Sequence, residues 1–341
     1  MEEEKSAYEL QDYNQPEEQR SFLNKTFGKL TPGSLRSSIF TLISTACGAG
    51  CLSITFVLSQ QGIIPGLLLL TICCLSALYG LINLSKAAEK YKCFIYADLV
   101  EKILGRHWRI FFENTMIVFV LGNLIASQVI IGLFVPGILE SINLEIGSDY
   151  ARIFIMVGIN WVIMVPLGLQ RTLTALRFVS IITPLVLVYI CFLLLCEFPL
   201  FVPHRDYSEV KYFTPNLSIF PSFGYCLFVF TCHSNVTQLY SELNRRSLAR
   251  MKKISFRAMF SLLFAYSFLS LFGYFSMLDD TPQQIIMRKP VDSIKNDWAM
   301  VLARGVMALS LIIGIPFNIP PSRTCIIQCW FRVKTEPSKL L

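Results

Sequence analysis

Charged residues are scarce in this chain, and their scarcity excludes several classes of protein. Asp, Glu, Lys and Arg make up 16% of the 341 residues, whereas an ordinary soluble domain carries about 25%. Hydrophobic residues reach 54%, and the mean hydropathy is +0.55. This composition excludes a disordered chain, a coiled coil and a disulfide-stapled secreted module. It favours a single polytopic membrane domain.

Catalytic and metal-binding motifs are also missing from the sequence. There is no P-loop, no Gly-x-Ser-x-Gly elbow and no His-Glu-x-x-His zinc motif. The whole chain has three histidines, His107, His204 and His233, which excludes a His-rich metal site. We therefore expect neither an enzyme nor a resident cofactor or metal.

The 11 cysteines do not indicate a disulfide framework. Most of them lie inside apolar runs, where a thiol behaves as a small apolar side chain. Cys325 and Cys329 are four residues apart, but without a second pair or a nearby histidine they are weak evidence for a metal site. No loop expected on the outer side of the membrane holds a cysteine pair, so no structural disulfide is predicted.

The N-terminus lacks the features of a secretory signal. Met1 is followed by three glutamates, whereas a signal peptide needs a basic start and an early apolar core. Seven of the first twenty residues are acidic. Residues 1–33 are therefore predicted to form an acidic, disordered cytoplasmic tail, with a regulatory arm as the alternative use.

Long apolar runs dominate the rest of the sequence. A helix that spans a bilayer needs roughly 20 mainly apolar residues. Eight segments meet that length, at about 37–59, 64–85, 111–135, 151–169, 175–198, 219–241, 257–278 and 298–319. They do not alternate in polarity as barrel strands do, and lipid cannot satisfy open backbone groups. The sequence therefore predicts an all-α polytopic membrane protein with about eight spans.

Basic residues alternate between the loops on the two sides of these spans. The loops expected on one side, together with both tails, hold 23 Lys and Arg, whereas the loops on the other side hold 6. The positive-inside rule then places both termini in the cytoplasm. Because the net charge of +7 lies in short loops between apolar runs, we expect a lipid bilayer and not nucleic acid as the partner.

Three further polar features fall between or inside the spans. Residues 96–105 have apolar positions at helical spacing and end in a glycine, which predicts a short amphipathic helix packed on the cytoplasmic face of the bundle. Asn123, Ser127 and Gln128 in the third span are expected to form interhelical hydrogen bonds. Arg304, two turns inside the last span, is expected to snorkel outward or to pair with an acid.

The first span contains glycines and hydroxyls where an uninterrupted helix would carry apolar residues. Ser44 and Thr45 precede Gly48 and Gly50, and a glycine costs a helix about 1 kcal/mol relative to alanine. Close packing of small residues against another helix is one explanation. The other is a helix that unwinds in mid-membrane, whose freed amide groups can bind a carboxylate.

The sixth span carries His233 beside Ser234 and Asn235. Such side chains are costly in lipid, so they should face the protein interior or a water-filled cavity. His233 is either satisfied by a neighbouring helix or carries a coupled proton. The first and sixth spans begin two successive five-span units, and broken helices at corresponding positions indicate a transporter site.

At these two spans the chain resembles the amino acid/auxin permease family, which includes the sodium-coupled neutral and the vacuolar amino acid transporters. Residues 48–57 stand where the family has Gly-x-Gly-Ile-Leu-x-Leu-Pro-Tyr-Ala, with Thr55 in place of the proline. Residues 230–243 follow the sixth-span motif Phe-x-x-His-x-Asn-x-x-x-(Ile/Leu)-Tyr-x-Glu-Leu. Residues 316–323 look like the Pro-x-Arg signature after the eighth span, so the resemblance covers residues 35 to about 325.

The resemblance implies a fold of two inverted five-helix repeats with an amino acid substrate bound between the first and sixth spans. It implies secondary active transport by alternating access. The expected substrate-binding residues are Thr45, Gly48, Ala49, Gly50, Phe230, Cys232 and Asn235. Ser44 and His233 are the candidates for binding the coupling ion, H⁺ or Na⁺. Because Ser44 is a shorter ligand than the asparagine of sodium-coupled members, a proton is favoured.

The family fold needs eleven spans, whereas this sequence ends about twenty residues after the eighth. We therefore expect an incomplete second repeat, with a transmembrane amino acid transporter domain over residues 34–325 and a cytoplasmic C-terminal tail over 326–341. A truncated, non-transporting amino acid sensor or regulator is the alternative function. The resemblance allows a vacuolar or lysosomal membrane or the plasma membrane.

Overall fold

The computed structural model describes residues 33–141, 179–214, 216–288, 297–312 and 314, and the isolated positions 153, 157, 158 and 162. Within these ranges the chain forms helices and loops and no strand, as the predicted all-α class requires. Five predicted features lie outside the described residues, apart from Gly33 and those isolated positions: the two tails, the span 151–169, the cysteine pair and the signature at 316–323.

Among the described residues, four helices are long and apolar enough to cross a membrane. They are α5 (Ile63–Tyr91), α7 (Arg106–Ser141), α10 (Val179–Phe201) and α13 (Leu248–Met277). A bent helix pair near the N-terminus forms a fifth candidate, and a shorter apolar helix covers Trp298–Ile312. Each of them overlaps a predicted span, so the chain is a polytopic membrane protein. The total of eight spans and the inverted repeat stay predictions.

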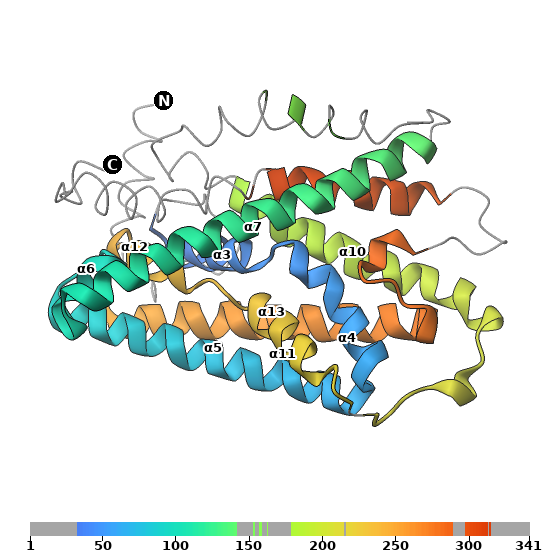
Figure 1. Ribbon diagram of the computed structural model, residues 1–341, viewed down its shortest axis with the longest axis horizontal. Helices are drawn as coiled ribbons and strands as arrows, with labels where there is room; N and C mark the ends of the chain where they lie inside the picture. Colours follow the sequence, from blue (N-terminus) through green and yellow to red (C-terminus); the bar gives the residue numbers. More distant parts are fainter. Residues whose placement is uncertain are drawn as a thin grey trace, which may run out of the picture.

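Helix α13 lies alongside α5 in the described bundle (Figure 1). It also packs against α10 and against both halves of the first span, and its Leu262 and Tyr266 are fully buried. The outer faces of α5, α7, α10 and α13 expose apolar side chains, such as Tyr79, Val118, Phe192 and Phe264. Lipid tails are as apolar as these side chains, so the outer faces suit contact with a bilayer.

The predicted amphipathic helix is confirmed as α6 (Tyr96–Leu104). It ends at Gly105, whose φ of +94° is a conformation that glycine adopts without a side-chain clash. The Gly105 N–H donates to the carbonyl of Glu101 at 2.9 Å, which closes the last turn. The chain then enters α7 directly, so the two helices form a corner.

Arg109, in the first turn of α7, fixes this corner. Its guanidinium pairs with Asp98 at 3.0 Å and with Glu113 at 2.8 Å, and it also bonds Glu101. Two of the three acids belong to α6 and one to α7, so a single side chain joins both helices. Trp108 beside it is exposed, as an aromatic side chain at a membrane–water interface would be.

The first span is broken, as the unwinding hypothesis predicted. Helix α3 (Leu35–Ala46) stops at Cys47, and the chain resumes as the 3₁₀ turn η2 (Ala49–Ser53) followed by α4 (Ile54–Gln61). The two halves are bent by 61°. Small-residue packing alone would have left the helix continuous, so the break at Cys47 and Gly48 requires the unwinding explanation.

The sixth span is broken too. Helix α11 (Ile219–Phe228) ends before the motif, and the turn η7 (His233–Asn235) leads into the short helix α12 (Val236–Ser241). Helix α11 packs against α4 and η2. The two interrupted spans therefore lie against one another.

The helix Trp298–Ile312 is tied to α10 near both of its ends. Ser310 donates to the Thr183 hydroxyl at 3.0 Å, and the Tyr189 hydroxyl donates to the carbonyl of Ala299 at the same distance. Arg304, in the middle of this helix, donates from Nε to the carbonyl of Ile286 at 2.9 Å. This arginine therefore binds a backbone carbonyl of the loop after α13.

Candidate functional site

The break in the first span leaves free space beside Gly48. The Cys47 N–H donates to the carbonyl of Ile43 at 2.8 Å, which closes α3. Gly48 is then extended, with φ −107° and ψ −166°, and η2 starts at the next residue. A Cβ built on Gly48 would meet nothing within 4 Å, so open space lies beside it.

Gly50 lies in a different environment from Gly48. A Cβ built on it would come within 2.8 Å of the Phe228 ring, at the end of α11. Gly50 therefore allows the two broken spans to approach one another closely. Its role is helix contact, whereas Gly48 faces empty volume.

A cavity of about 50 Å³ lies at the break. Its walls come from the first span, from α7, from the end of α11 and from the last described helix. The lining residues are Ser44, Thr45, Ala46, Cys47, Gly48, Phe119, Asn123, Ser127, Phe228, Thr231, Ser310, Leu311 and Gly314. One water needs about 10–15 Å³ of such volume, so the cavity has room for a few groups of the size of a carboxylate or an ammonium.

Ser44 supplies a polar atom to this cavity that the described part of the protein leaves unsatisfied. Its side chain is buried, and its Oγ has no hydrogen-bond partner there. A buried hydroxyl without a partner costs about 1–3 kcal/mol. The other hydroxyls of the wall have partners: Thr45, Ser127 and Thr231 donate to carbonyls of their own segments. Ser310 donates to the Thr183 hydroxyl on α10. Ser44 is therefore the lining atom with the most to gain from a ligand.

The cavity wall is polar without being charged. Among the described residues that line it there is no Asp, Glu, His, Lys or Arg. A zwitterionic ligand would therefore be held by hydroxyl, amide and backbone dipoles, as helix breaks allow. The site offers no fixed counter-charge for a charged side chain.

The structure brings part of the predicted residue set to the cavity. Ser44, Thr45 and Gly48 line it, and Gly50, the second residue of η2, lies against Phe228. Ala49 opens η2, and only its backbone is described. The described lining contains none of the three predicted sixth-span residues, which are Phe230, Cys232 and Asn235.

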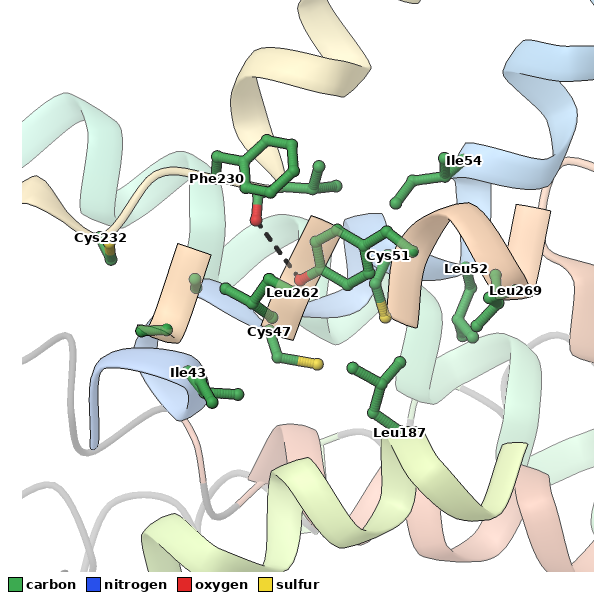
Figure 2. Close-up of a cluster of buried hydrophobic side chains, with 14 of the residues drawn as sticks. Ile43, Cys47, Cys51, Leu52, Ile54, Leu187, Phe230, Cys232, Leu262 and Leu269 are labelled. Carbon is green, nitrogen blue, oxygen red and sulfur yellow. Dashed lines mark hydrogen bonds between the residues drawn. The ribbon is translucent and has the colours of Figure 1, made fainter. Parts of the chain in front are cut away.

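Those three residues are buried in the protein core instead. Figure 2 shows Phe230 and Cys232 among apolar side chains, together with Cys47 and Cys51 from the first span. The Phe230 ring contacts the Tyr266 ring at a centroid distance of 5.5 Å. Their role as substrate ligands stays a prediction, and in this conformation they hold the break in place.

His233 also lies away from the cavity. Its Nε2 is 3.2 Å from the carbonyl of Ala77 on α5, and a Cβ on Gly80 would be 2.8 Å from the same nitrogen. The missing side chain at Gly80 therefore makes room for the imidazole. This geometry fits the alternative in which the histidine is satisfied by a neighbouring helix.

Sequence reasoning missed the wall that α7 and the last helix supply. Asn123 and Ser127 are four residues apart and share one face of α7, and that spacing was a usable signal. Phe228 and Thr231, rather than Phe230 and Cys232, represent the sixth span. No pattern in the sequence marks Ser310 as a lining residue, because one hydroxyl in an apolar helix is common.

Comparison with known proteins supports the amino acid transport that the sequence motifs predict. A family model described as "Transmembrane amino acid transporter protein" matches residues 31–340. The Saccharomyces cerevisiae vacuolar amino acid transporter 5 is 26% identical over 320 residues, which cover 86% of this chain and 67% of that protein. Vacuolar amino acid transporter 6 of the same yeast is 23% identical over 310 residues, with 86% and 66% covered.

A human relative, solute carrier family 38 member 10, is 26% identical over 292 residues, which cover 84% of this chain and 25% of that protein. Across six curated relatives, the chain spans between 25% and 67% of their length. No solved structure matches the chain.

Proposed function

Because the chain belongs to the transmembrane amino acid transporter family, we propose that it moves amino acids across a membrane by secondary active transport with alternating access. The observation that carries the proposal is the cavity at the two helix breaks, with the unsatisfied Ser44 hydroxyl and the free space beside Gly48. Binding at the meeting point of broken helices is the arrangement that such transporters use.

The substrate head group binds, in this proposal, between Gly48 and the polar face of α7. The carboxylate is held by amide groups at the start of η2 and by the Ser44 hydroxyl. Asn123 and Ser127 face the ammonium group, for which amide and hydroxyl oxygens are acceptors. The uncharged wall favours neutral amino acids over charged ones.

The coupling ion in this proposal is a proton rather than sodium. Ser44 offers a single hydroxyl oxygen where sodium-coupled members of the family present an amide, which weakens a sodium site. His233 is the proposed carrier, reached through a rearrangement that releases it from Ala77. The relatives named as vacuolar transporters favour a vacuolar or lysosomal membrane over the plasma membrane, with both termini in the cytoplasm.

The test is binding and flux with the purified chain. Individual amino acids are screened for thermal stabilisation of the protein in detergent, and those that bind are offered as labelled substrates to proteoliposomes. Uptake that requires a pH gradient supports proton-coupled transport. Binding without flux supports the alternative, a non-transporting amino acid sensor or regulator. If the chain shows no binding and no flux, both functions are contradicted.

One variant tests the assigned site. Gly48→Leu places a side chain into the cavity without a clash, since no atom lies within 4 Å of its Cβ. We expect a folded protein that no longer binds the amino acid. Gly122→Leu is the matched control, because Gly122 is an exposed helical glycine of α7 with the same free space. Equal binding by both variants would place the substrate elsewhere.

A further inference from the structure

Gly314 is a second glycine in the wall of the cavity, and it follows the helix Trp298–Ile312. A Cβ built on Gly314 would meet no atom within 4 Å, which is also true of Gly48. Gly305, in the same helix, differs, because a Cβ there would lie 3.9 Å from the Ile138 side chain. The cavity therefore has free space beside glycines from two different spans.

The first span and α7 supply the polar groups of the wall that can still bind a ligand. The Ser44 Oγ has no hydrogen-bond partner in the described part of the protein. Asn123 also lines the cavity, and its side-chain amide can both donate and accept. These are the groups to which the proposed function assigns the substrate head group.

The wall formed by the last helix has a different chemistry. The Ser310 hydroxyl donates to the Thr183 hydroxyl on α10 at 3.0 Å, so its proton is used outside the cavity. Leu311 has an apolar side chain, and Gly314 has none. The lining residues that the structure describes on this helix therefore present no free side-chain donor.

A wall of this kind distinguishes between substrate side chains. A polar side chain placed against it would lose hydrogen bonds to water without replacing them, which weakens binding. An apolar side chain gains affinity from the water that it leaves. With the head group beside Gly48, the free space at Gly314 therefore suits an apolar side chain.

The volume of the cavity limits the size of that side chain. The cavity measures about 50 Å³, which is room for about three to five waters. Covalently bonded atoms lie closer together than separate waters, so a small amino acid such as alanine or valine fills this space. A larger side chain needs a wall that moves.

We propose that the substrates are small amino acids with apolar side chains, and that Gly314 sets the largest side chain the cavity accepts. This inference rests on the proposed function, because it adds side-chain selectivity to the same site. The head group lies beside Gly48 and Ser44. The side chain lies against Leu311 and the free space at Gly314.

Isothermal titration with valine and threonine tests the apolar wall. The two amino acids have nearly the same shape, but threonine carries a hydroxyl in place of one methyl group. We expect valine to bind about 10–100-fold more tightly, because the threonine hydroxyl is buried without a partner. Threonine binding as tight as that of valine would overturn the apolar assignment.

Gly314→Ala tests the size limit with a single methyl group. Affinity for valine should fall by about tenfold or more, the value of one such group in an apolar pocket, while affinity for glycine stays within about twofold. The ratio of the two affinities is the readout, because a general loss of folded protein would not change it. Gly305→Ala is the matched control, since it adds the same group to the same helix outside the lining residues.

The outcomes separate failure of this inference from failure of the proposed function. If the chain binds amino acids and Gly314→Ala keeps the valine-to-glycine ratio of Gly305→Ala, the function stands and the inference is overturned. Equal loss of glycine and valine in Gly314→Ala would assign the free space to the head group and overturn it as well. An unmodified chain that binds no amino acid would contradict the function, and the inference with it. If Gly314→Ala fails to fold, the comparison of valine with threonine in the unmodified chain decides.

Discussion

The Tyr266 hydroxyl on α13 donates to the backbone carbonyl of Val229, at 3.4 Å, where the sixth span is broken. The bond is drawn as the dashed line in Figure 2. An unwound segment leaves backbone groups without helical partners, and lipid cannot supply them. Tyr266 is fully buried, so α13 provides the polar contact that allows the break to exist inside the membrane.

Replacing this tyrosine tests that role. Tyr266→Phe keeps the ring against Phe230 but removes the donor, and it leaves the Val229 carbonyl buried without that partner. We expect a loss of about 1 kcal/mol, near the low end for an unsatisfied buried group because the bond is long. Denaturant unfolding in detergent measures it. Tyr79→Phe, on the exposed face of α5, should leave stability unchanged, and equal effects of the two variants would contradict the assignment.

Gly80 makes room for His233, which a single methyl group can test. Gly80→Ala puts a Cβ at 2.8 Å from Nε2, and overpacking of this kind costs about 1–3 kcal/mol. The direction of the stability change is informative, because replacing a glycine by alanine elsewhere in a helix stabilises the helix by about 1 kcal/mol. We expect Gly80→Ala to lower the melting temperature and Gly122→Ala, which has no neighbour, to leave or raise it.

A double-mutant cycle isolates the pair. Adding His233→Ala to Gly80→Ala should recover most of the lost stability, because the methyl group then occupies the space of the ring. If the two losses simply add, Gly80 is required for some other contact.

Ser44→Ala should separate binding from stability. The hydroxyl has no partner in the described part of the protein, so its removal should leave the free energy of unfolding unchanged or slightly higher. Affinity for the amino acid should fall by about 2–10-fold, the value of one hydrogen bond. Isothermal titration measures this. Ser85→Ala is the control, since the Ser85 hydroxyl bonds Leu81 within α5 at 2.7 Å and lies outside the cavity wall. An unchanged affinity in Ser44→Ala would remove this residue from the site.

The sequence predicted best where a local rule decides the structure. Glycines at positions 48 and 50 weaken a helix regardless of its surroundings, and the break appeared there. The amphipathic helix 96–105 was equally local, since its apolar spacing and terminal glycine mark both its existence and its end. Apolar runs also located the long helices, because lipid contact demands them.

Which residues line the cavity depends on how the helices pack against one another. Motifs and spacing within one segment of the sequence do not reveal that packing. Helix α11 ends at Phe228, so the backbone turns before the motif and directs Phe230 into the core. Asn123 and Ser127 marked a polar face of α7, but nothing in their spacing identified its partner. Arg288 and Glu197 are 91 positions apart in the sequence, and only the fold brings them together.

The corner that Arg109 fixes has a mechanical meaning. Three acids from two helices hold one guanidinium, so α6 and the first turns of α7 turn as one lever. The long arm of that lever carries Phe119, Asn123 and Ser127 in the cavity wall, and the exposed Trp108 lies at the corner between the two helices. Any tilt of α7 that widened the cavity would therefore move α6 through the same angle.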